Sequence, residues 1–325
     1  MNTKHMMAAF ACAAALCGSV QAADAEAEKD SAESKEASQG WNWAMGEGVT
    51  YNETPIVSAE VGLAFDSKYL SYGLVDNNDP ILTPSAALTF FDWVTLSVES
   101  IFDISRYGDA AGYGNRSWQY TELDPGAAIG HSFGPDDASW LPTTIEFEIG
   151  YMYEAHPAVT GPDTQFVTLT VALPDLWFEP AFQYEQDIQR DEGAYLNLEI
   201  GHTFALVEGV EEGDDDILDL RVSAAQGWGN KRRIRGYLPD IHNVEVDDEG
   251  NEEYGALNHE GLMDTTVKVE MTWNITDGVA LSGYVAYVDY LLDPSTREAS
   301  RHYEATGAWT DSYNFVAGAA ISFAF

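Results

Sequence analysis

Apolar and polar residues alternate with a period of two along most of the chain. Ile145 and Phe147, for example, alternate with Glu146 and Glu148. A period of two is typical of a β-strand that has one apolar and one polar face. The alternation predicts strands over 56–70, 81–91, 93–103, 117–131, 143–154, 164–173, 176–187, 194–204, 216–226, 262–274, 279–291 and 312–325. The sequence therefore predicts a fold built almost entirely of strands.

The last of these strands ends on the last residue given. Its apolar positions, counted back in steps of two, are Phe325, Phe323, Ile321, Ala319, Ala317, Phe315 and Tyr313. An exposed aromatic strand edge invites pairing with other chains, whereas a closed barrel in lipid pairs its last strand with its first. The segment resembles the C-terminal strand of bacterial outer-membrane β-barrels. That resemblance implies that Phe325, Phe323 and Ile321 form a signal for the barrel assembly machinery. The alternative is an ordinary C-terminal strand of a soluble β protein.

The connections between the predicted strands differ in length on the two sides. If the N-terminus lies in the periplasm, the extracellular connections include the longest ones, at 106–116, 154–163, 227–261 and 293–311. The periplasmic connections are turns and shorter loops, at 92, 134–142, 174–175, 205–215 and 274–278. This sorting favours an all-β fold, a transmembrane antiparallel up-and-down β-barrel of about twelve strands, with ten and fourteen as alternatives. Proline normally avoids strand interiors, and three prolines conflict with the predicted strands: Pro84, Pro125 and Pro180.

The first residues have the features of a secretory signal peptide. Lys4 and His5 precede an apolar stretch over 6–20 that is too short to cross a bilayer. Val20-Gln21-Ala22 then supplies a small-x-small cleavage signal. We therefore expect residues 1–22 to be removed during export through the inner membrane.

The rest of the chain divides into a tail and one domain. Residues 23–40 are mostly Ala, Glu, Ser, Lys and Asp and are expected to form a flexible acidic periplasmic tail. Residues 41–325 are expected to form the barrel, with the segment 41–55 either docking on its rim or plugging its lumen. Both cysteines, Cys12 and Cys17, lie in the signal peptide, so the mature protein would contain no disulfide.

The polar positions of the alternating strands are expected to face the inside of the barrel. Arg or Lys on the lipid face would cost about 2–4 kcal/mol at the bilayer midplane. The candidate pore-lining residues are Glu99, Glu146, Glu148, Glu199, Asp219, Arg221, Lys268 and Glu270, and the same parity contains Glu60 and Glu185. Their acidic excess favours a water-filled pore for cations or neutral polar solutes. The alternative is a narrow barrel filled by a side-chain ion network. In that case some of the charges on two strands expected to be adjacent would pair, with Asp219 and Arg221 on one and Lys268 and Glu270 on the other.

The net charge of −39 argues against nucleic-acid binding, which needs basic patches. One basic cluster, Lys231, Arg232, Arg233 and Arg235, interrupts this acidic background in the longest extracellular connection. It is interpreted as a contact for lipopolysaccharide phosphates, as an anion-attracting pore mouth, or as an internal partner of the acidic run 247–253. The acidic runs lack the ligand spacing of an EF-hand, so we expect no metal ion and no cofactor.

The sequence does not favour an enzyme. His131 and Ser132 are neighbours, but neighbours on a strand point to opposite faces and cannot act as a nucleophile and its base. His156 or His302 with a loop carboxylate would be needed for a protease at the outer rim, and no motif supports this.

The first hairpin resembles that of TorF-type putative porins. Ser67-Lys68-Tyr69, Gly73 and Pro80 match the motif of that family loosely, although Leu70-Ser71-Tyr72 replaces its usual Arg-rich middle. The resemblance covers the first hairpin and the C-terminal strand, and implies a porin-type barrel in the outer membrane. We therefore expect passive diffusion of small polar or cationic solutes. The alternative is a closed structural or adhesive barrel whose long extracellular loops bind a surface partner. The oligomeric state and the solute are not predicted.

Overall fold

The computed structural model describes residues 41–44, 48–51, 54–104, 119–135, 137–157, 163–209, 216–246, 252–276, 278–305 and 313–325. The expected signal peptide and acidic tail lie outside the described residues. Within the described residues, no helix is both long enough and apolar enough to cross a membrane, and that finding has no bearing on strands.

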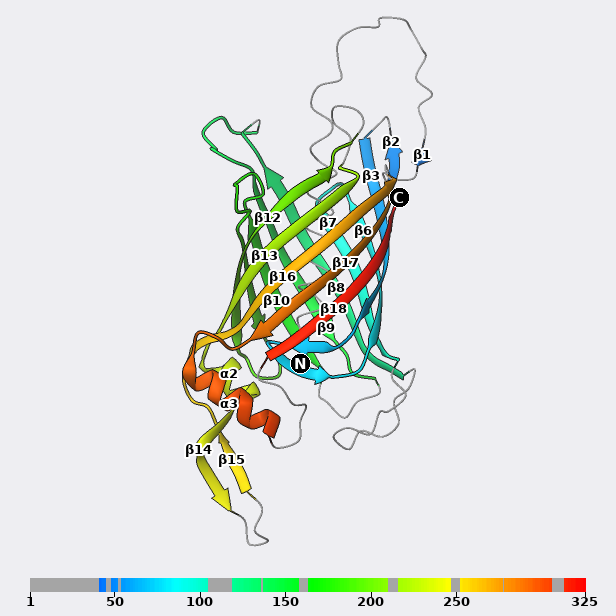
Figure 1. The fold of residues 1–325 in the computed structure, drawn as a ribbon. Coiled ribbons are helices and arrows are strands. Elements are labelled where there is room, and N and C mark those ends of the chain that lie inside the picture. The colour runs from blue at the N-terminus through cyan, green and yellow to red at the C-terminus, as the bar shows by residue number, and fades with distance from the viewer. Residues whose placement is uncertain are drawn as a thin grey trace, which may run out of the picture.

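A closed antiparallel barrel forms the body of the protein (Figure 1). Twelve strands close into a ring because β3 pairs with β6 on one side and with β18 on the other. These strands are β3 (Thr54–Asp66), β6 (Ile81–Phe90), β7 (Val94–Asp103), β8 (Gln119–Phe133), β9 (Ile145–Glu154), β10 (Thr164–Ala172), β11 (Ala181–Asp187), β12 (Ala194–Val207), β13 (Leu218–Gly229), β16 (Gly261–Thr276), β17 (Val279–Asp289) and β18 (Tyr313–Ala324). The predicted fold class and strand number are confirmed.

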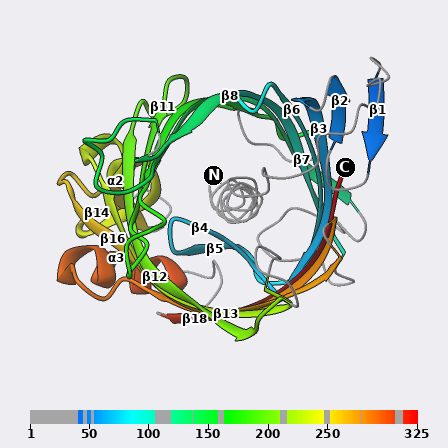
Figure 2. The ribbon, with the colours of Figure 1, turned by 90° about the horizontal axis from the view of Figure 1, so that it is seen from above.

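The segment before β3 forms a short hairpin rather than a plug. β1 (Trp41–Ala44) pairs with β2 (Gly48–Tyr51), and β2 pairs with the first residues of β3. In the view along the barrel, both strands lie outside the ring (Figure 2).

The three prolines fall where the strand ladder is incomplete. The pairing of β6 with β7 stops at Leu82 and resumes at Ser85, so Pro84 lies in the gap. Pro125 pairs with β7, but the continuous register between β8 and β9 begins one residue later. Pro180 directly precedes β11. A missing backbone donor is tolerated at such positions.

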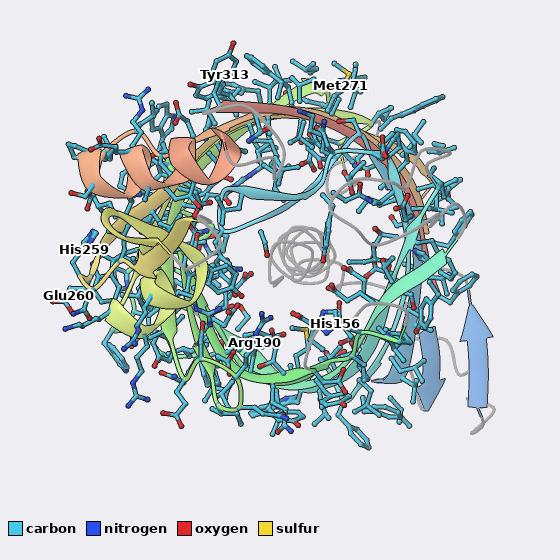
Figure 3. All side chains as sticks on the ribbon, turned by 90° about the horizontal axis from the view of Figure 1, so that it is seen from below. His156, Arg190, His259, Glu260, Met271 and Tyr313 are labelled. Carbon is cyan, nitrogen blue, oxygen red and sulfur yellow. The ribbon has the colours of Figure 1, made fainter. Side chains whose placement is uncertain are left out.

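The outer face of the ring is apolar. Exposed side chains of the apolar parity include Val98, Ile149, Leu198, Ile200, Val267, Val269 and Met271, and Met271 and Tyr313 point away from the barrel (Figure 3). Aromatic rings gather near both ends of the wall. They include the stacked pairs Trp93–His131 and Trp177–His202 at one end, and Tyr287–Tyr313 at the other. An apolar band between two aromatic girdles is the pattern of a transmembrane barrel.

The extended connections lie at one end of the barrel (Figure 1). They contain α2 (Lys231–Tyr237), β14 (Pro239–Val246), β15 (Glu252–Ala256) and α3 (Pro294–Ala305). At the other end, β6 and β7 are joined by residues 91–93, and β16 and β17 by residues 277–278. The predicted sorting of connections is therefore observed, although neither helix was predicted. We call the end with the helices the loop end and the other the turn end.

The first connection folds back into the barrel. β4 (Tyr69–Ser71) and β5 (Leu74–Asn77) form a hairpin that lies inside the ring in the axial view (Figure 2). Leu70 and Val75 of this hairpin pack against Val288 and Val316 of the wall, and all four side chains are buried. These wall residues are apolar although they face inward, because the hairpin covers them.

A charge on the lipid face is expected to destabilise the barrel. Val269 lies in the middle of β16 and its outward side chain is 38% exposed. The Val269→Arg variant should lose about 2–4 kcal/mol in unfolding free energy in lipid vesicles, because the guanidinium would lie in hydrocarbon. Asn197→Arg, on the inner face of β12, is the matched control and should lose less. Equal losses would contradict the assignment of faces.

Candidate functional site

The tip of the inward hairpin adopts a strained conformation. Ser71 pairs with Leu74, so Tyr72 and Gly73 form a two-residue turn in which both φ angles are positive, at 45° and 88°. Such a turn matches the twist of the strands, but an aromatic residue rarely adopts a positive φ. A Cβ on Gly73 would lie 2.7 Å from the ring of Tyr290, so this position has no room for a side chain. Strain of this kind persists where surrounding contacts enforce it.

A buried arginine supplies those contacts. The Arg233 Nη1 donates to the Tyr72 hydroxyl at 2.8 Å, and that hydroxyl donates to Glu185. The Arg233 Nη2 lies 3.2 Å from the Glu185 Oε1 and donates to the Gly193 carbonyl at 3.2 Å. Its Nε lies 3.5 Å from Asp191. The contacts join α2, the hairpin tip and the β11–β12 region of the wall.

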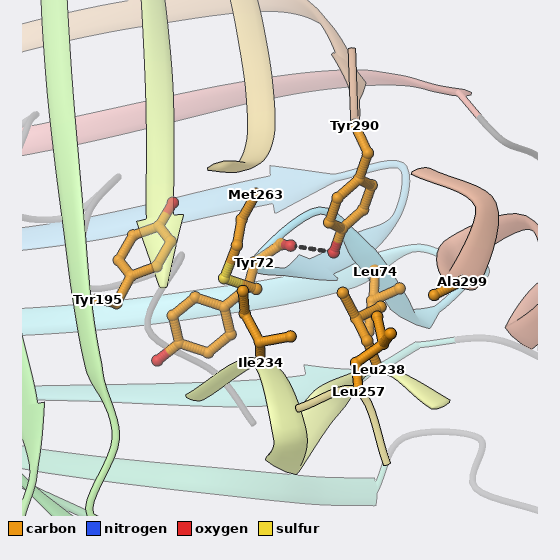
Figure 4. Close-up of a cluster of buried hydrophobic side chains, with 9 residues drawn as sticks. All are labelled: Tyr72, Leu74, Tyr195, Ile234, Leu238, Leu257, Met263, Tyr290 and Ala299. Atoms are coloured by element: carbon orange, nitrogen blue, oxygen red, sulfur yellow. Dashed lines mark hydrogen bonds between the residues drawn. The ribbon is translucent and has the colours of Figure 1, made fainter. Parts of the chain in front are cut away.

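Apolar packing surrounds this contact (Figure 4). A buried cluster contains Tyr72 and Leu74 from the hairpin, Ile234 from α2, Ala299 from α3, and Tyr195, Leu238, Leu257, Met263 and Tyr290. Tyr290 donates its hydroxyl proton to the Tyr72 carbonyl, and the Tyr195 hydroxyl donates to Asp264 at 2.7 Å. The loop-end elements and the hairpin therefore form one packed unit, which we call the cap.

The charge on Arg233 is strongly favoured in this environment. Burial by itself lowers the pKa of the guanidinium, but Tyr72, Tyr237 and Glu185 outweigh that effect and raise the pKa well above its usual value. The Arg233 side chain is fully buried and Glu185 is 4% exposed. Removing one member of a buried ion pair typically costs about 3–5 kcal/mol, because the other charge stays buried.

Carboxylates crowd the inner wall near the loop end. They are Asp66, Glu99, Asp103, Glu122, Asp124, Glu154, Glu185, Asp187, Asp264 and Asp289, all buried. Glu99 is a member of this group and pairs in register with Asp124. The Tyr69 hydroxyl, on the hairpin, donates to Glu122 at 2.7 Å. Most of these residues stand near strand ends, where sequence alone does not fix the register.

The other candidate pore-lining residues lie on the inner face, nearer the turn end. Arg221 is paired with Glu199 at 3.2 Å and with Glu179 from the β10–β11 turn. Lys268 is paired with Glu270 on its own strand at 2.7 Å. Asp219 accepts from the Asn274 amide at 3.4 Å. The two strands are adjacent as expected, but Lys268 pairs along its own strand, and Glu179 was not recognised as a partner of Arg221.

Two carboxylates remain without such a partner. Among the residues that the structure describes, neither Glu146 nor Glu148 forms an ion pair. Both lie on the turn-end half of β9, on the face opposite that of the exposed Ile149. Glu99 likewise forms no ion pair with a described residue, but it is buried in the group near the loop end.

The basic cluster of the long connection is divided between two environments. Arg233 is buried in the cap, while Arg232 pairs with Glu192 at a position where both side chains are about 60% exposed. Among the described residues, the acidic partners of Arg232 and Arg233 are Glu185, Asp191 and Glu192. Much of the acidic run 247–253 lies outside the described residues. Lys231 and Arg235 are exposed on α2. With Arg232, they are the residues of the cluster that an external anion could reach.

One segment resembles a catalytic motif in spacing only. Gly130-His131-Ser132-Phe133-Gly134 has the Gly-x-Ser-x-Gly spacing of a nucleophile elbow. That motif requires a sharp turn from a strand into a helix, but these residues continue β8 to its end at Phe133. His131 stacks on Trp93 on the outer face, with ring centroids 4.1 Å apart, while Ser132 is paired with the inward Glu146. The two side chains therefore lie on opposite faces.

Three solved outer-membrane proteins are similar to the chain at very low sequence identity, with TM-scores below 0.5. The COG4313 outer-membrane channel from Pseudomonas putida F1 is 10% identical, with 83% of this chain and 96% of that chain covered and a TM-score of 0.44. The P. putida toluene transporter TodX is 10% identical, with 83% and 89% covered and a TM-score of 0.36. Acinetobacter baumannii OccAB3 is 7% identical, with 85% and 66% covered and a TM-score of 0.34.

The assignment of the barrel rests on the strand pairing and not on these similarities. No protein-family model and no curated protein matches the chain. The resemblance to TorF-type putative porins stays a prediction.

Loss of Arg233 is expected to loosen the cap. In Arg233→Ala, Glu185 would stay buried without the guanidinium, so local opening should become easier by about 3–5 kcal/mol. Amide hydrogen exchange in α2 and in the β4–β5 hairpin should then accelerate by roughly 10²–10⁴-fold. Arg232→Ala, at an exposed site on the same helix, should change it little. Similar protection in both variants would mean that apolar packing alone holds the cap.

Proposed function

We propose that the protein is a channel of the bacterial outer membrane for passive diffusion of small polar or cationic solutes. The main support is the division of the wall into two faces. The outer face exposes aliphatic and aromatic side chains between two girdles. The inner face carries a large excess of carboxylates. Charges in such number are costly to keep dry, which favours water in the lumen.

The inner charges favour cations over anions. Arg221 and Lys268 would attract anions if they were free, but each lies against at least one carboxylate. Glu146 and Glu148 have no such neighbour of opposite charge among the described residues. Rings of carboxylates select cations in channels. Solutes would enter this region after passing beside the inward hairpin, so the cap would set the size limit.

Export and assembly complete the proposal. A cleaved signal peptide over 1–22 would carry the chain through the inner membrane. Phe323 and Ile321 lie in the seam that closes the barrel, paired with Val61 and Leu63, and the Phe325 backbone bonds to Ala59. Their recognition by the barrel assembly machinery and a contact between the exposed basic residues and lipopolysaccharide remain part of the proposal.

The selectivity of the channel is the direct test. In planar bilayers with a salt gradient, the wild-type barrel should show discrete current steps with cation preference. The Glu146→Gln/Glu148→Gln variant should conduct with a reversal potential closer to zero, because the two negative charges are removed. Glu260→Gln, an exposed carboxylate in the loop-end connection, should leave the reversal potential unchanged. An unchanged value in the double variant would exclude these residues as the selectivity determinant.

A surface-binding barrel is the second candidate, because β14 and β15 project from the loop end beyond the helices (Figure 1). This hairpin can be removed with little damage, since its flanking residues Leu238 and Leu257 are already joined by a backbone hydrogen bond of 3.1 Å. Deletion of the longer segment 227–261 would also remove Arg233 from the cap and confuse the result. A channel without 239–256 should still conduct, whereas an adhesin should lose binding to its partner.

A further inference from the structure

Two strand ends bring a histidine and two glutamates together on the inner wall. Leu123 of β8 and Ala155 form an isolated bridge beyond the end of β9, with backbone hydrogen bonds of 3.0 and 2.9 Å. Residues that flank such a bridge face each other across the two strands. Glu122 is therefore opposite His156, and Glu154 points to the same side as His156. In the view along the barrel, His156 lies on the inner side of the wall (Figure 3).

The three side chains converge on one point. The His156 Nε2 lies 3.1 Å from the Glu154 Oε1 and 3.5 Å from the Glu122 Oε2. One ligand atom from each residue lies within 4.8 Å of the other two. Ligands about 2.0–2.2 Å from a tetrahedral metal ion are about 3.3–3.6 Å from one another. The two His–Glu distances are close to that spacing.

The histidine is poised as a ligand. Its side chain is 1% exposed, and neither ring nitrogen has a hydrogen-bond partner within the described part of the chain. A buried imidazole without such a partner is unusual.

A neighbouring carboxylate holds the histidine in place. Asp163 accepts from the His156 backbone N–H at 3.0 Å and from the Tyr153 hydroxyl at 2.5 Å. Its Oδ1 lies 3.9 Å from the His156 Nδ1, the nitrogen that points away from the glutamates. Histidine ligands commonly have a carboxylate on this second nitrogen, which orients the ring.

We propose that Glu122, Glu154 and His156 bind a divalent transition-metal ion of the Zn²⁺ type. An imidazole nitrogen with two carboxylates suits zinc and similar ions, whereas calcium and magnesium prefer oxygen ligands alone. Three protein ligands leave a position for water or for a solute. The bound ion would tie the end of β8 to the connection after β9. The site is distinct from the acidic runs considered in the sequence, and it does not depend on the channel function.

Zinc binding by the purified, folded barrel tests the proposal. After treatment with a chelator, the wild-type protein in detergent should bind one Zn²⁺ per chain in a calorimetric titration. His156→Gln and Glu154→Gln should each weaken binding strongly, and Asp163→Asn, the positioning residue, should weaken it by about 10–100-fold. With Co²⁺ as a probe, the visible spectrum of the wild type should change on replacement of His156.

A second histidine–carboxylate pair supplies the control. His259 lies 3.7 Å from Asp293 but is partly exposed and belongs to no three-residue group of this kind among the described residues. His259→Gln should therefore bind Zn²⁺ as the wild type does. Heat-modifiable migration on a gel verifies that each variant is folded, and Glu122→Gln replaces any variant that is not. Absence of binding by the wild type, or equal binding by all the variants, would overturn the proposal.

Discussion

The requirement that every backbone N–H and C=O in a bilayer be paired within the protein determines this structure. The wall meets it by joining β18 to β3, so that no strand edge is left open to lipid. Once the ring is closed, each strand must present one face to lipid and one to the lumen. The alternation of Ile149 and Glu148, or of Val269 and Glu270, follows from that constraint and gives the lumen its acidic lining.

The cap introduces a second level of organisation inside the ring. Tyr72 holds an unfavourable backbone conformation because its hydroxyl contacts both Arg233 and Glu185, and its carbonyl accepts from Tyr290. The contact links a helix of the loop end to a hairpin that fills part of the lumen. The inner wall beneath the hairpin is densely packed with carboxylates, while its turn-end half carries Glu146 and Glu148. In the proposed channel, a solute would therefore meet the packed hairpin first and the acidic half of the wall after it.

The sequence predicted the parts of the fold that depend on local alternation. All twelve wall strands were predicted. Their faces were assigned correctly because a period of two places all the apolar residues of a strand on one side, and that side must face the lipid. The β4–β5 hairpin was missed because Tyr69-Leu70 reads as a continuation of the first strand, and only tertiary contact with Val288 and Val316 explains its apolar residues. Arg233 looked like part of a surface cluster, since no local pattern indicates that Glu185 and Tyr72 lie beside it. Glu122 and His156 were not connected because their pairing depends on the register of two strand ends.

The central claim is that the acidic face of the wall is wetted while the other face is not, and thiol accessibility tests it most directly. The natural cysteines, Cys12 and Cys17, lie in the segment expected to be removed. Variants with one introduced cysteine each can therefore be compared at neighbouring positions. A charged, membrane-impermeant thiol reagent should modify cysteines at 148 and 199 in the folded barrel in lipid, and should not modify cysteines at 149 and 200. Inward cysteines that react only after unfolding would contradict the account and indicate a barrel filled by its own side chains.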